Sequence, residues 1–356
     1  MLTSSLPLRK VSIYLWLLLV SGAITTTQAQ THVYVTNSCD NTIGVIDTET
    51  NTVVANVPVA PGAVDLAVTP DGARVYVTGV TVSVIDTTTN AVVATVPVSA
   101  SAVAITPDGA RVYVANGLTV SIIDTATNTV VDTISTSSFV RGVAITPDGT
   151  RVYLTNNVNS TITVLDTATN AVVTTISTGF NLNLVGVVFT PDGTRAYVED
   201  QTEFLNVIDT ATNTFIAHIL QPIFHNFMAF TPDGTRLYVT SANIGSVFVI
   251  DPSTNAVVNS IPLGGFLSPI EPAVTPDGKR IYTVNVQNTV SAIATATNTV
   301  IATISGFSCP IRIATTPPPQ APKSKDDCKD GGYKNFGLLA FENQGQCVKF
   351  VNQQTN

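Results

Sequence analysis

Three short motifs recur along most of the chain, and this repetition constrains the fold more than any other feature of the sequence. Thr-Pro-Asp-Gly begins at Thr69, Thr106, Thr146, Thr190, Thr231 and Thr275. Asp-x-x-Thr-Asn begins at Asp47, Asp86, Asp124, Asp166, Asp209 and Asp251, with a seventh copy at Ala294. Tyr34-Val-Thr-Asn returns in variant form at Tyr76, Tyr113, Tyr153, Tyr197, Tyr238 and Tyr282. Seven copies at a spacing of about forty residues predict a seven-bladed β-propeller.

Each copy contains four short segments with the pattern of β-strands. In the second copy, residues 74–78 and 81–85 alternate apolar and polar side chains, and residues 91–98 are rich in β-branched residues. The motifs between them suit turns, because Pro presets φ, Gly adopts a left-handed conformation, Asp accepts backbone hydrogen bonds and Asn tolerates positive φ. Each turn offers only one or two carboxylates, so we expect no calcium or other metal site there. The sequence therefore predicts an all-β fold.

The three motifs together resemble the YVTN-type propeller repeats of exported and surface proteins. The resemblance covers about Thr31 to Thr316. It implies an exported or surface-exposed propeller, and it supplies no catalytic motif that maps onto this chain. The C-terminal segment, with Cys328 and Cys347, resembles a short cysteine-paired motif found at the ends of exported bacterial proteins.

The two ends of the repeat region are out of phase in a complementary way. His32-Val-Tyr-Val matches the second strand of a copy, so the first copy lacks its innermost strand. Ile311-Arg-Ile-Ala-Thr-Thr matches that missing strand, and Pro317 follows it in place of the usual turn. We therefore expect blade 1 to be closed by three N-terminal strands and one C-terminal strand, which leaves no open blade edge.

Four cysteines follow the N-terminal segment, and an even number in an exported chain suggests disulfides. Cys39 lies just after the second strand of blade 1 and Cys309 just before the returning strand, so both belong to loops on one face. These positions predict a Cys39–Cys309 disulfide, which leaves Cys328 and Cys347 to link the tail. No Cys-x-x-Cys pair is present, which argues against a structural zinc site.

The chain divides into four segments. Arg9 and Lys10, a ten-residue apolar run and Thr27-Gln28-Ala29 predict a signal peptide over residues 1–29; an uncleaved anchor is the alternative. The propeller follows over residues 30–316, then a linker over 317–327 and a disulfide-linked tail over 328–356. The mature protein is expected to be secreted, extracellular or at the cell surface, or periplasmic, without a membrane span.

Composition excludes some classes of partner. Charged residues make up 11% of the chain and the net charge is −8, so nothing favours binding to nucleic acid or to an anionic membrane. We expect a monomer without a cofactor. The ligand, a protein or a glycan, is expected on the face that carries the variable loops rather than the repeated turns.

The variable loops contain an aromatic residue in five consecutive copies. These residues are Phe139, Phe180, Phe224, Phe266 and Phe307. They form either an apolar collar for a partner or packing plugs between blades. The loop from Leu220 to Met228 departs most from the repeat, and it contains Phe224 and His225.

A few charged residues are expected near the mouth of the central channel. Asp65, Glu271 and Arg312 each lie four residues before the Thr that begins the following turn, and Arg141 lies five before. Opposite charges on blades 7, 1 and 2 predict a ladder of ion pairs that either locks the closure or meets a polar ligand.

The sequence favours a non-enzymatic scaffold for binding and recognition. Only three histidines occur in the chain, and no nucleophile elbow or phosphate loop is present. One alternative is an exported hydrolase or lyase that acts through His225, Glu271 and Arg141, which requires these side chains to converge. Another is a structural protein of the cell envelope, anchored by its tail.

Overall fold

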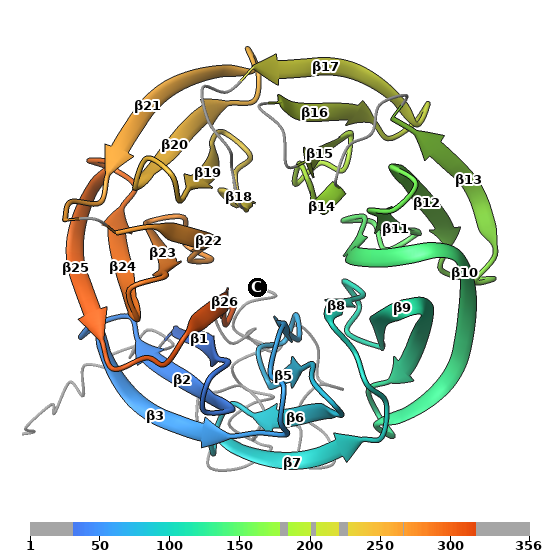
Figure 1. The fold of residues 1–356 in the computed structure, drawn as a ribbon, viewed down its shortest axis with the longest axis horizontal. Coiled ribbons are helices and arrows are strands. Elements are labelled where there is room, and N and C mark those ends of the chain that lie inside the picture. The colour runs from blue at the N-terminus through green and yellow to red at the C-terminus, as the bar shows by residue number, and fades with distance from the viewer. Residues whose placement is uncertain (1–30, 179–183, 201–203, 221–226, 266, 318–356) are drawn as a thin grey trace, which may run out of the picture.

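The computed structural model describes residues 31–178, 184–200, 204–220, 227–265 and 267–317. In these residues, 26 strands form six antiparallel sheets arranged as a ring (Figure 1). The described part of the chain contains no helix that could span a bilayer. The predicted all-β propeller is confirmed. The predicted signal peptide and the tail with Cys328 and Cys347 lie outside the described residues, as does the linker after Pro317.

Five of the described sheets have four strands, and each runs from an inner strand near the axis to an outer strand at the rim. The closing sheet contains β26 (Pro310–Thr315), β1 (His32–Asn37), β2 (Thr42–Asp47) and β3 (Thr52–Pro58). The next contains β4 (Leu66–Val68), β5 (Arg74–Val77), β6 (Val82–Asp86) and β7 (Ala91–Val96). Another contains β14 (Leu184–Phe189), β15 (Arg195–Asp200), β16 (Phe204–Asp209) and β17 (Thr214–Leu220). The last two contain β18 (Met228–Phe230), β19 (Leu237–Ser241), β20 (Ser246–Asp251) and β21 (Ala256–Pro262), then β22 (Pro269–Val274), β23 (Arg280–Asn285), β24 (Thr289–Ala294) and β25 (Thr299–Ser305).

The sixth sheet has six strands and corrects the prediction of seven separate blades. It contains β8 (Ala102–Ile105), β9 (Arg111–Asp124), β10 (Thr129–Ile145), β11 (Arg151–Asn156), β12 (Thr161–Asp166) and β13 (Val172–Ser177). β10 pairs with β9 from Thr129 to Ser135 and again at Val140, and it pairs with β11 from Val140, so one strand serves both the third and the fourth sequence copies. The two copies therefore share one sheet, and the structure has six sheets rather than seven.

The predicted closure of the ring is confirmed in the closing sheet. β26 pairs antiparallel with β1, with Val33 opposite Thr315 and Val35 opposite Ile313. Beyond the ladder, the Thr316 N–H donates to the carbonyl of His32 over 2.9 Å. The C-terminal strand thus lies inside the N-terminal hairpin and completes its sheet (Figure 1).

The hydrophobic core lies between neighbouring copies of the repeat, whether these belong to two sheets or share the six-stranded sheet. One cluster, for example, packs Val33 and Val35 of the closing sheet against Val284 and Ala292 of the sheet beside it. The largest fully buried side chains are the motif tyrosines, Tyr34, Tyr76, Tyr113, Tyr153, Tyr197, Tyr238 and Tyr282. Each repeat therefore buries its apolar side chains only by stacking on its neighbours.

The repeated motifs connect each copy to the next. Every motif Tyr hydroxyl donates to the side-chain oxygen of the Asn that ends the Asp-x-x-Thr-Asn turn of the following copy. The donor–acceptor pairs are Tyr34–Asn90, Tyr76–Asn128, Tyr113–Asn170, Tyr153–Asn213, Tyr197–Asn255, Tyr238–Asn298 and Tyr282–Asn51. The last pair, at 2.7 Å, closes the circle. The motifs thus recur because each one is half of a contact between copies.

Glycine in the Thr-Pro-Asp-Gly turn has two reasons to recur. Gly149 has φ of 72°, a left-handed conformation that strains residues with a side chain. A Cβ added to it would also lie only 3.2 Å from the ring of Pro107 in the preceding copy. Gly234 meets Pro191 in the same way, at 3.1 Å. The turns therefore nest against one another around the ring.

Candidate functional site

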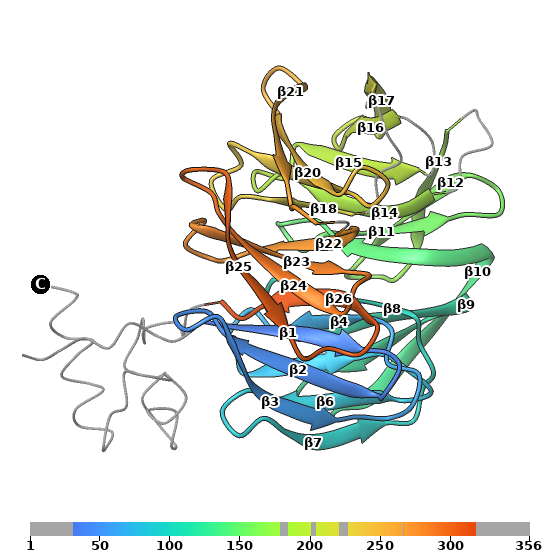
Figure 2. The same cartoon turned by 60° about the vertical axis from the view of Figure 1, so that its left-hand side comes forward.

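The ring has two chemically different faces. Because consecutive strands alternate in direction, both repeated turns of each copy emerge on one side, which we call the turn face. The loops between the second and third strands, and those between copies, emerge on the other side, the loop face. Figure 2 shows the ring obliquely, with the strands running back and forth between the two faces. Bonds between loops, such as Gly62 N–H to Asn41 Oδ1 at 2.8 Å, tie the loop face together.

The loop face presents an exposed aliphatic side chain at a recurring place. Four of the described loops between second and third strands carry one, and the corresponding place in the third copy, which lies within β9, carries another. These residues are Val80, Leu118, Val158, Ile244 and Val286, with 53% to 74% of their surface exposed. The loop of the closing sheet carries Cys39 instead, which is disulfide-bonded. This regular exposure was not predicted, although each residue follows the Tyr motif at a similar distance in the sequence.

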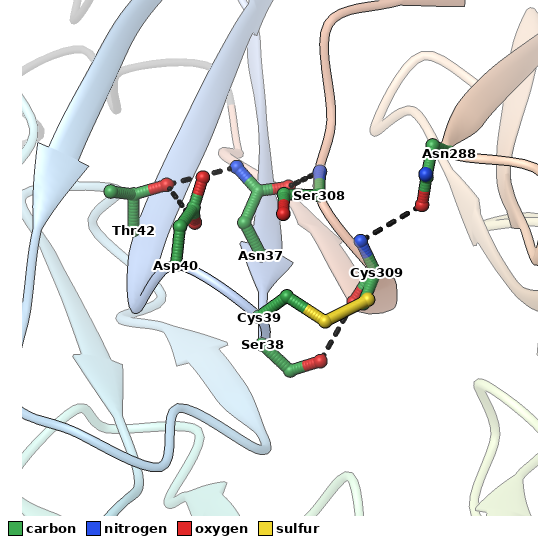
Figure 3. Close-up of a disulfide and its surroundings, with 8 residues drawn as sticks. All are labelled: Asn37, Ser38, Cys39, Asp40, Thr42, Asn288, Ser308 and Cys309. Carbon is green, nitrogen blue, oxygen red and sulfur yellow. Dashed lines mark hydrogen bonds between the residues drawn. A yellow bond between two sulfur atoms is a disulfide. The ribbon is translucent and has the colours of Figure 1, made fainter.

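The predicted disulfide lies in the closing sheet and is confirmed (Figure 3). Cys39 and Cys309 are bonded, with Cα atoms 5.4 Å apart across a sequence separation of 270 residues. Backbone and side chain of Ser38 both donate to the Cys309 carbonyl, at 3.2 and 2.8 Å. The Cys309 N–H donates to Asn288 Oδ1 over 2.9 Å. The disulfide is therefore embedded in a hydrogen-bonded loop cluster.

The three charges predicted near the axis do come together. The Arg312 Nε lies 3.5 Å from Asp65 Oδ1 and 3.9 Å from Glu271 Oε2. Each carboxylate also accepts from the backbone of a neighbouring inner strand: Glu271 from Ile313 N–H at 2.9 Å, and Asp65 from Val103 N–H at 3.0 Å. The Arg312 guanidinium lies 4.0 Å from the centre of the Phe227 ring, a cation–π contact.

Burial raises the pKa of both carboxyls in this charged cluster. The Glu271 side chain is only 20% exposed, and burial raises its pKa to about 8; Asp65 adds to the rise, while Arg312 and the Ile313 N–H oppose it. Burial likewise raises the pKa of Asp65, opposed by Arg312 and by two backbone N–H groups. Carboxyls perturbed in this way occur both in structural ion pairs and in functional sites.

Phe227 was not predicted, although the same rule identifies it. It lies four residues before Thr231, the position that Asp65, Glu271 and Arg312 occupy in their own copies. The remaining copies have small residues at this position, namely Ala102, Gly142 and Gly186. The axis is therefore lined by bulky or charged side chains on the closing side and by small residues opposite.

The other predicted residues are dispersed or lie outside the described part. Phe139 is 48% exposed and packs against Gly117, whereas Phe307 is buried and packs against Gly44. Arg141 is exposed, and within the described residues it forms no ion pair with Glu271. The remaining predicted residues, Phe180, Phe224, His225 and Phe266, lie outside the described residues. The required convergence of Arg141 with Glu271 is not found, and that of His225 stays a prediction.

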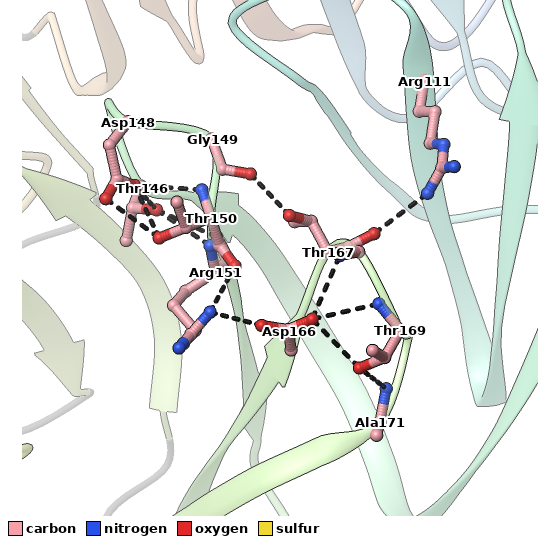
Figure 4. Close-up of polar contacts among 11 residues, drawn as sticks. Arg111, Thr146, Asp148, Gly149, Thr150, Arg151, Asp166, Thr167, Thr169 and Ala171 are labelled. Carbon is pink, nitrogen blue, oxygen red and sulfur yellow. Dashed lines mark hydrogen bonds and ion pairs between the residues drawn. The ribbon is translucent and has the colours of Figure 1, made fainter.

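The turn face is hollowed at two equivalent junctions between copies. One pocket, of about 320 Å³, lies between the third and fourth copies, and the other, of about 310 Å³, between the fifth and sixth. In the first, Arg111 Nη1 donates to the Thr167 carbonyl over 2.9 Å, and Thr167 Oγ1 donates to the Gly149 carbonyl over 2.7 Å (Figure 4). Asp148 accepts from Thr146 and Thr150 at the pocket wall. No group of three or more His, Cys, Asp or Glu suited to a metal occurs in the described residues.

Comparison with known proteins supports the propeller fold. No protein-family model matches the chain, and no curated protein matches it significantly. A solved structure of Kuenenia stuttgartiensis hydrazine synthase is 26% identical with a TM-score of 0.67, and the match covers 74% of this chain and 92% of that one. A functionally unknown protein from Desulfotomaculum acetoxidans DSM 771 is 20% identical with a TM-score of 0.73, covering 81% and 99%. The second likeness concerns the fold alone.

Proposed function

We propose that the chain is an exported, non-enzymatic propeller of the YVTN type that binds a protein partner through its loop face. The observation that carries the proposal is the exposed aliphatic residue repeated at five equivalent positions of that face. Exposed apolar groups gathered on one face are typical of interaction surfaces. The opposite face is built from hydrogen-bonded turns whose residues are used in contacts between copies.

The chemistry of the loop face favours a protein over a membrane or nucleic acid. The whole chain is acidic, so an anionic bilayer or a phosphate backbone would be repelled rather than attracted. Val80, Leu118 and Val286 offer aliphatic contacts, and Phe139 adds an exposed aromatic ring. A partner with a complementary apolar patch would remove these side chains from water, which supplies most of the binding free energy in such interfaces.

The test compares matched substitutions on the loop face and on the rim. Val158→Asp with Val286→Asp places two charges on the loop face, whereas Val131→Asp with Val173→Asp places the same charges on outer strands of similar exposure. Partners would be captured from the native cell surface with the mature chain, and affinities would be measured for the captured protein. We expect the loop-face variant to lose binding by about tenfold or more and the rim variant to bind as the parent does. Equal binding by both variants would contradict the proposal.

Export and the N-terminal boundary form part of the same proposal. The disulfide and the lack of a membrane-spanning helix in the described residues are compatible with a location outside the cytoplasm. We expect the mature protein to begin at Gln30, which mass spectrometry of secreted material would establish. A mass that retains residues 1–29 would favour the uncleaved anchor.

An enzyme with a site at the axis is the second candidate. The observation in its favour is Glu271, a carboxyl whose pKa burial raises to about 8 beside the Arg312 guanidinium. One of the similar structures is also named as an enzyme, hydrazine synthase. Screening hydrolase and lyase substrates against the parent and Glu271→Gln would separate the candidates. An activity that the substitution abolishes while the loop-face partner still binds would favour the enzyme.

A further inference from the structure

The two pockets of the turn face are copies of one another, residue by residue. Nine residues line each pocket, and they occupy the same positions in the repeat. The corresponding residues that matter for binding are Pro107 and Pro191, Asp108 and Asp192, Arg111 and Arg195, Asp148 and Asp233, and Ala168 and Ser253. An accidental surface hollow has no reason to be repeated with the same lining, so the two pockets are a feature of the repeat.

An arginine lines each pocket and holds the same side-chain position in both. Arg111 Nη1 donates to the carbonyl of Thr167 in the next copy, and Arg195 Nη1 donates to that of Pro252 at 3.0 Å. At the intervening junction, Arg151 turns back instead and pairs with Asp166 of its own copy, at 2.6 Å. Arg74 makes the same forward bond to the Thr125 carbonyl at the junction between the second and third copies. In each of the two pockets the forward-reaching arginine spans the wall and brings a fixed guanidinium to the edge.

The carboxylates of the pocket are ionised and still able to accept hydrogen bonds. Oδ1 of Asp108 accepts from Thr106 and from the Ala110 N–H, and these bonds hold the pKa of Asp108 below its usual value. Within the described residues, Oδ2 of Asp108 accepts no hydrogen bond, and the same is true of Oδ2 of Asp192. One carboxylate oxygen in each pocket is thus available to a ligand donor.

We propose that these pockets bind single units of a neutral or amino-bearing saccharide polymer. Two carboxylates and one guanidinium offer both acceptors and donors to the hydroxyl groups of a sugar. The ring of Pro107 and the methyl group of Ala168 supply an apolar wall for its C–H face. The three charges sum to about −1 per pocket, which disfavours uronic acids and other anionic sugars.

Repetition of the pocket suits a repeating ligand. Each pocket lies at the lower end of the volume range of small-molecule sites, so one unit alone should bind weakly. Both pockets open on the same face, and a polymer that reaches both gains effective concentration at the second one. The site is independent of the loop-face partner proposed above, because the two lie on opposite faces.

The test uses substitutions that the repeat already tolerates. Ala168 and Ser253 correspond to Glu49 in the first copy, so Ala168→Glu with Ser253→Glu fills both pockets without a new kind of turn. Ala110 and Thr194 correspond to Lys279, so Ala110→Lys with Thr194→Lys fills them with the opposite charge. The matched control is Ala211→Glu with Ala296→Glu, which changes the same position and charge at two junctions outside both pockets, where Arg151 and Arg236 turn back to their own copies.

Binding of the full mature chain would be measured by calorimetry against chito-oligosaccharides and malto-oligosaccharides of increasing length, with polygalacturonate as the anionic comparison. We expect affinity for at least one neutral or amino series to rise with length. Both pocket-filling variants should weaken it by about tenfold or more, and the control should not. Absence of saccharide binding, preference for polygalacturonate, equal loss in the control, or full binding by either pocket-filling variant would overturn the proposal. Binding of a protein partner to the loop face is measured in a separate experiment. A failure of the saccharide proposal can therefore be told apart from a failure of the loop-face proposal.

Discussion

The closing sheet and the six-stranded sheet show two ways of joining parts of the ring. In the six-stranded sheet, β10 runs from the third copy into the fourth as one continuous strand. In the closing sheet, β26 and β1 come from opposite ends of the repeat region and are held together by hydrogen bonds, apolar packing and a disulfide. The same Tyr–Asn bond occurs beside both, as Tyr282–Asn51 and Tyr113–Asn170.

The difference shows where extra stabilisation is needed. Where the chain itself is continuous, the repeated contacts suffice and the axis carries Ala102, Gly142 and Gly186. Where the ends meet, the disulfide is added and the Arg312 ion pairs span the closing sheet and both neighbours. The charges at the axis are therefore explained first by ring closure, since a closed ring must hold its two ends together against their conformational entropy.

Removing the disulfide should lower the stability of the closing sheet more than any other substitution proposed below. Cys39→Ala with Cys309→Ala frees two ends separated by 270 residues, which in a chain-entropy model lowers the free energy of unfolding by about 5 kcal/mol. The midpoint of thermal unfolding should fall by about 10 °C. The control is Ser137→Gly in the bulge of β10, which should change stability by less than about 1 kcal/mol. Similar losses in both variants would show that the closing sheet is not the weaker of the two.

Removing the central cation should have the next largest effect. Arg312→Met leaves Asp65 and Glu271 mostly buried beside each other without the neighbouring cation, and we expect a loss of about 3 kcal/mol in urea unfolding. The triple variant Asp65→Asn, Glu271→Gln and Arg312→Met removes the charges together and should recover much of that loss. A triple variant no more stable than Arg312→Met would contradict an electrostatic role for the group.

Glu271 should make stability fall as the pH rises. Its pKa is about 8 in the folded chain, above the ordinary value of 4.5, so the folded state holds the proton more tightly than the unfolded state does. Stability from this residue is fully present below about pH 4.5 and is lost as the pH rises through about 8. Between pH 5 and 9, urea midpoints of the parent should fall more steeply than those of Glu271→Gln. Parallel curves would show that Glu271 does not titrate in this window.

The sequence predicts those features that depend on the phase of the repeat. The pairing of β26 with β1, the Cys39–Cys309 disulfide and the Arg312 ion pairs all follow from the position of a residue within its copy. The six-stranded sheet differs from the seven separate blades that the repeat predicts, which require a loop after Ile134 between the third and fourth copies. That loop, Ser135 to Arg141, contains neither Pro nor Gly, so nothing in it interrupts the strand.

The residue preferences of the turns do not predict the hydrogen bonds between copies. The Asn of each Asp-x-x-Thr-Asn turn was explained by its tolerance of positive φ, and Asn170 does have φ of 56°. Its side chain has a second role, since it accepts from Tyr113 of the preceding copy. Because the turn alone explains why Asn stands at this position, the sequence does not indicate that its side chain also accepts a hydrogen bond. Only the three-dimensional arrangement of the copies shows both roles.

The smallest expected effect tests whether the repeated contact is equally strong beside both sheets. Tyr282→Phe removes the hydroxyl that donates to Asn51, and Tyr113→Phe removes the one that donates to Asn170. Each should cost about 1 kcal/mol, because a single buried hydrogen bond contributes roughly that much. Double-mutant cycles with Asn51→Gly and Asn170→Gly, which keep the positive φ accessible, isolate the pair energy in urea unfolding. We expect the two coupling energies to agree within about 0.5 kcal/mol. A clearly larger value for Tyr282–Asn51 would mean that the closing side depends on this bond more than the continuous side does, so that the disulfide and the ion pairs alone do not compensate for the break in the chain.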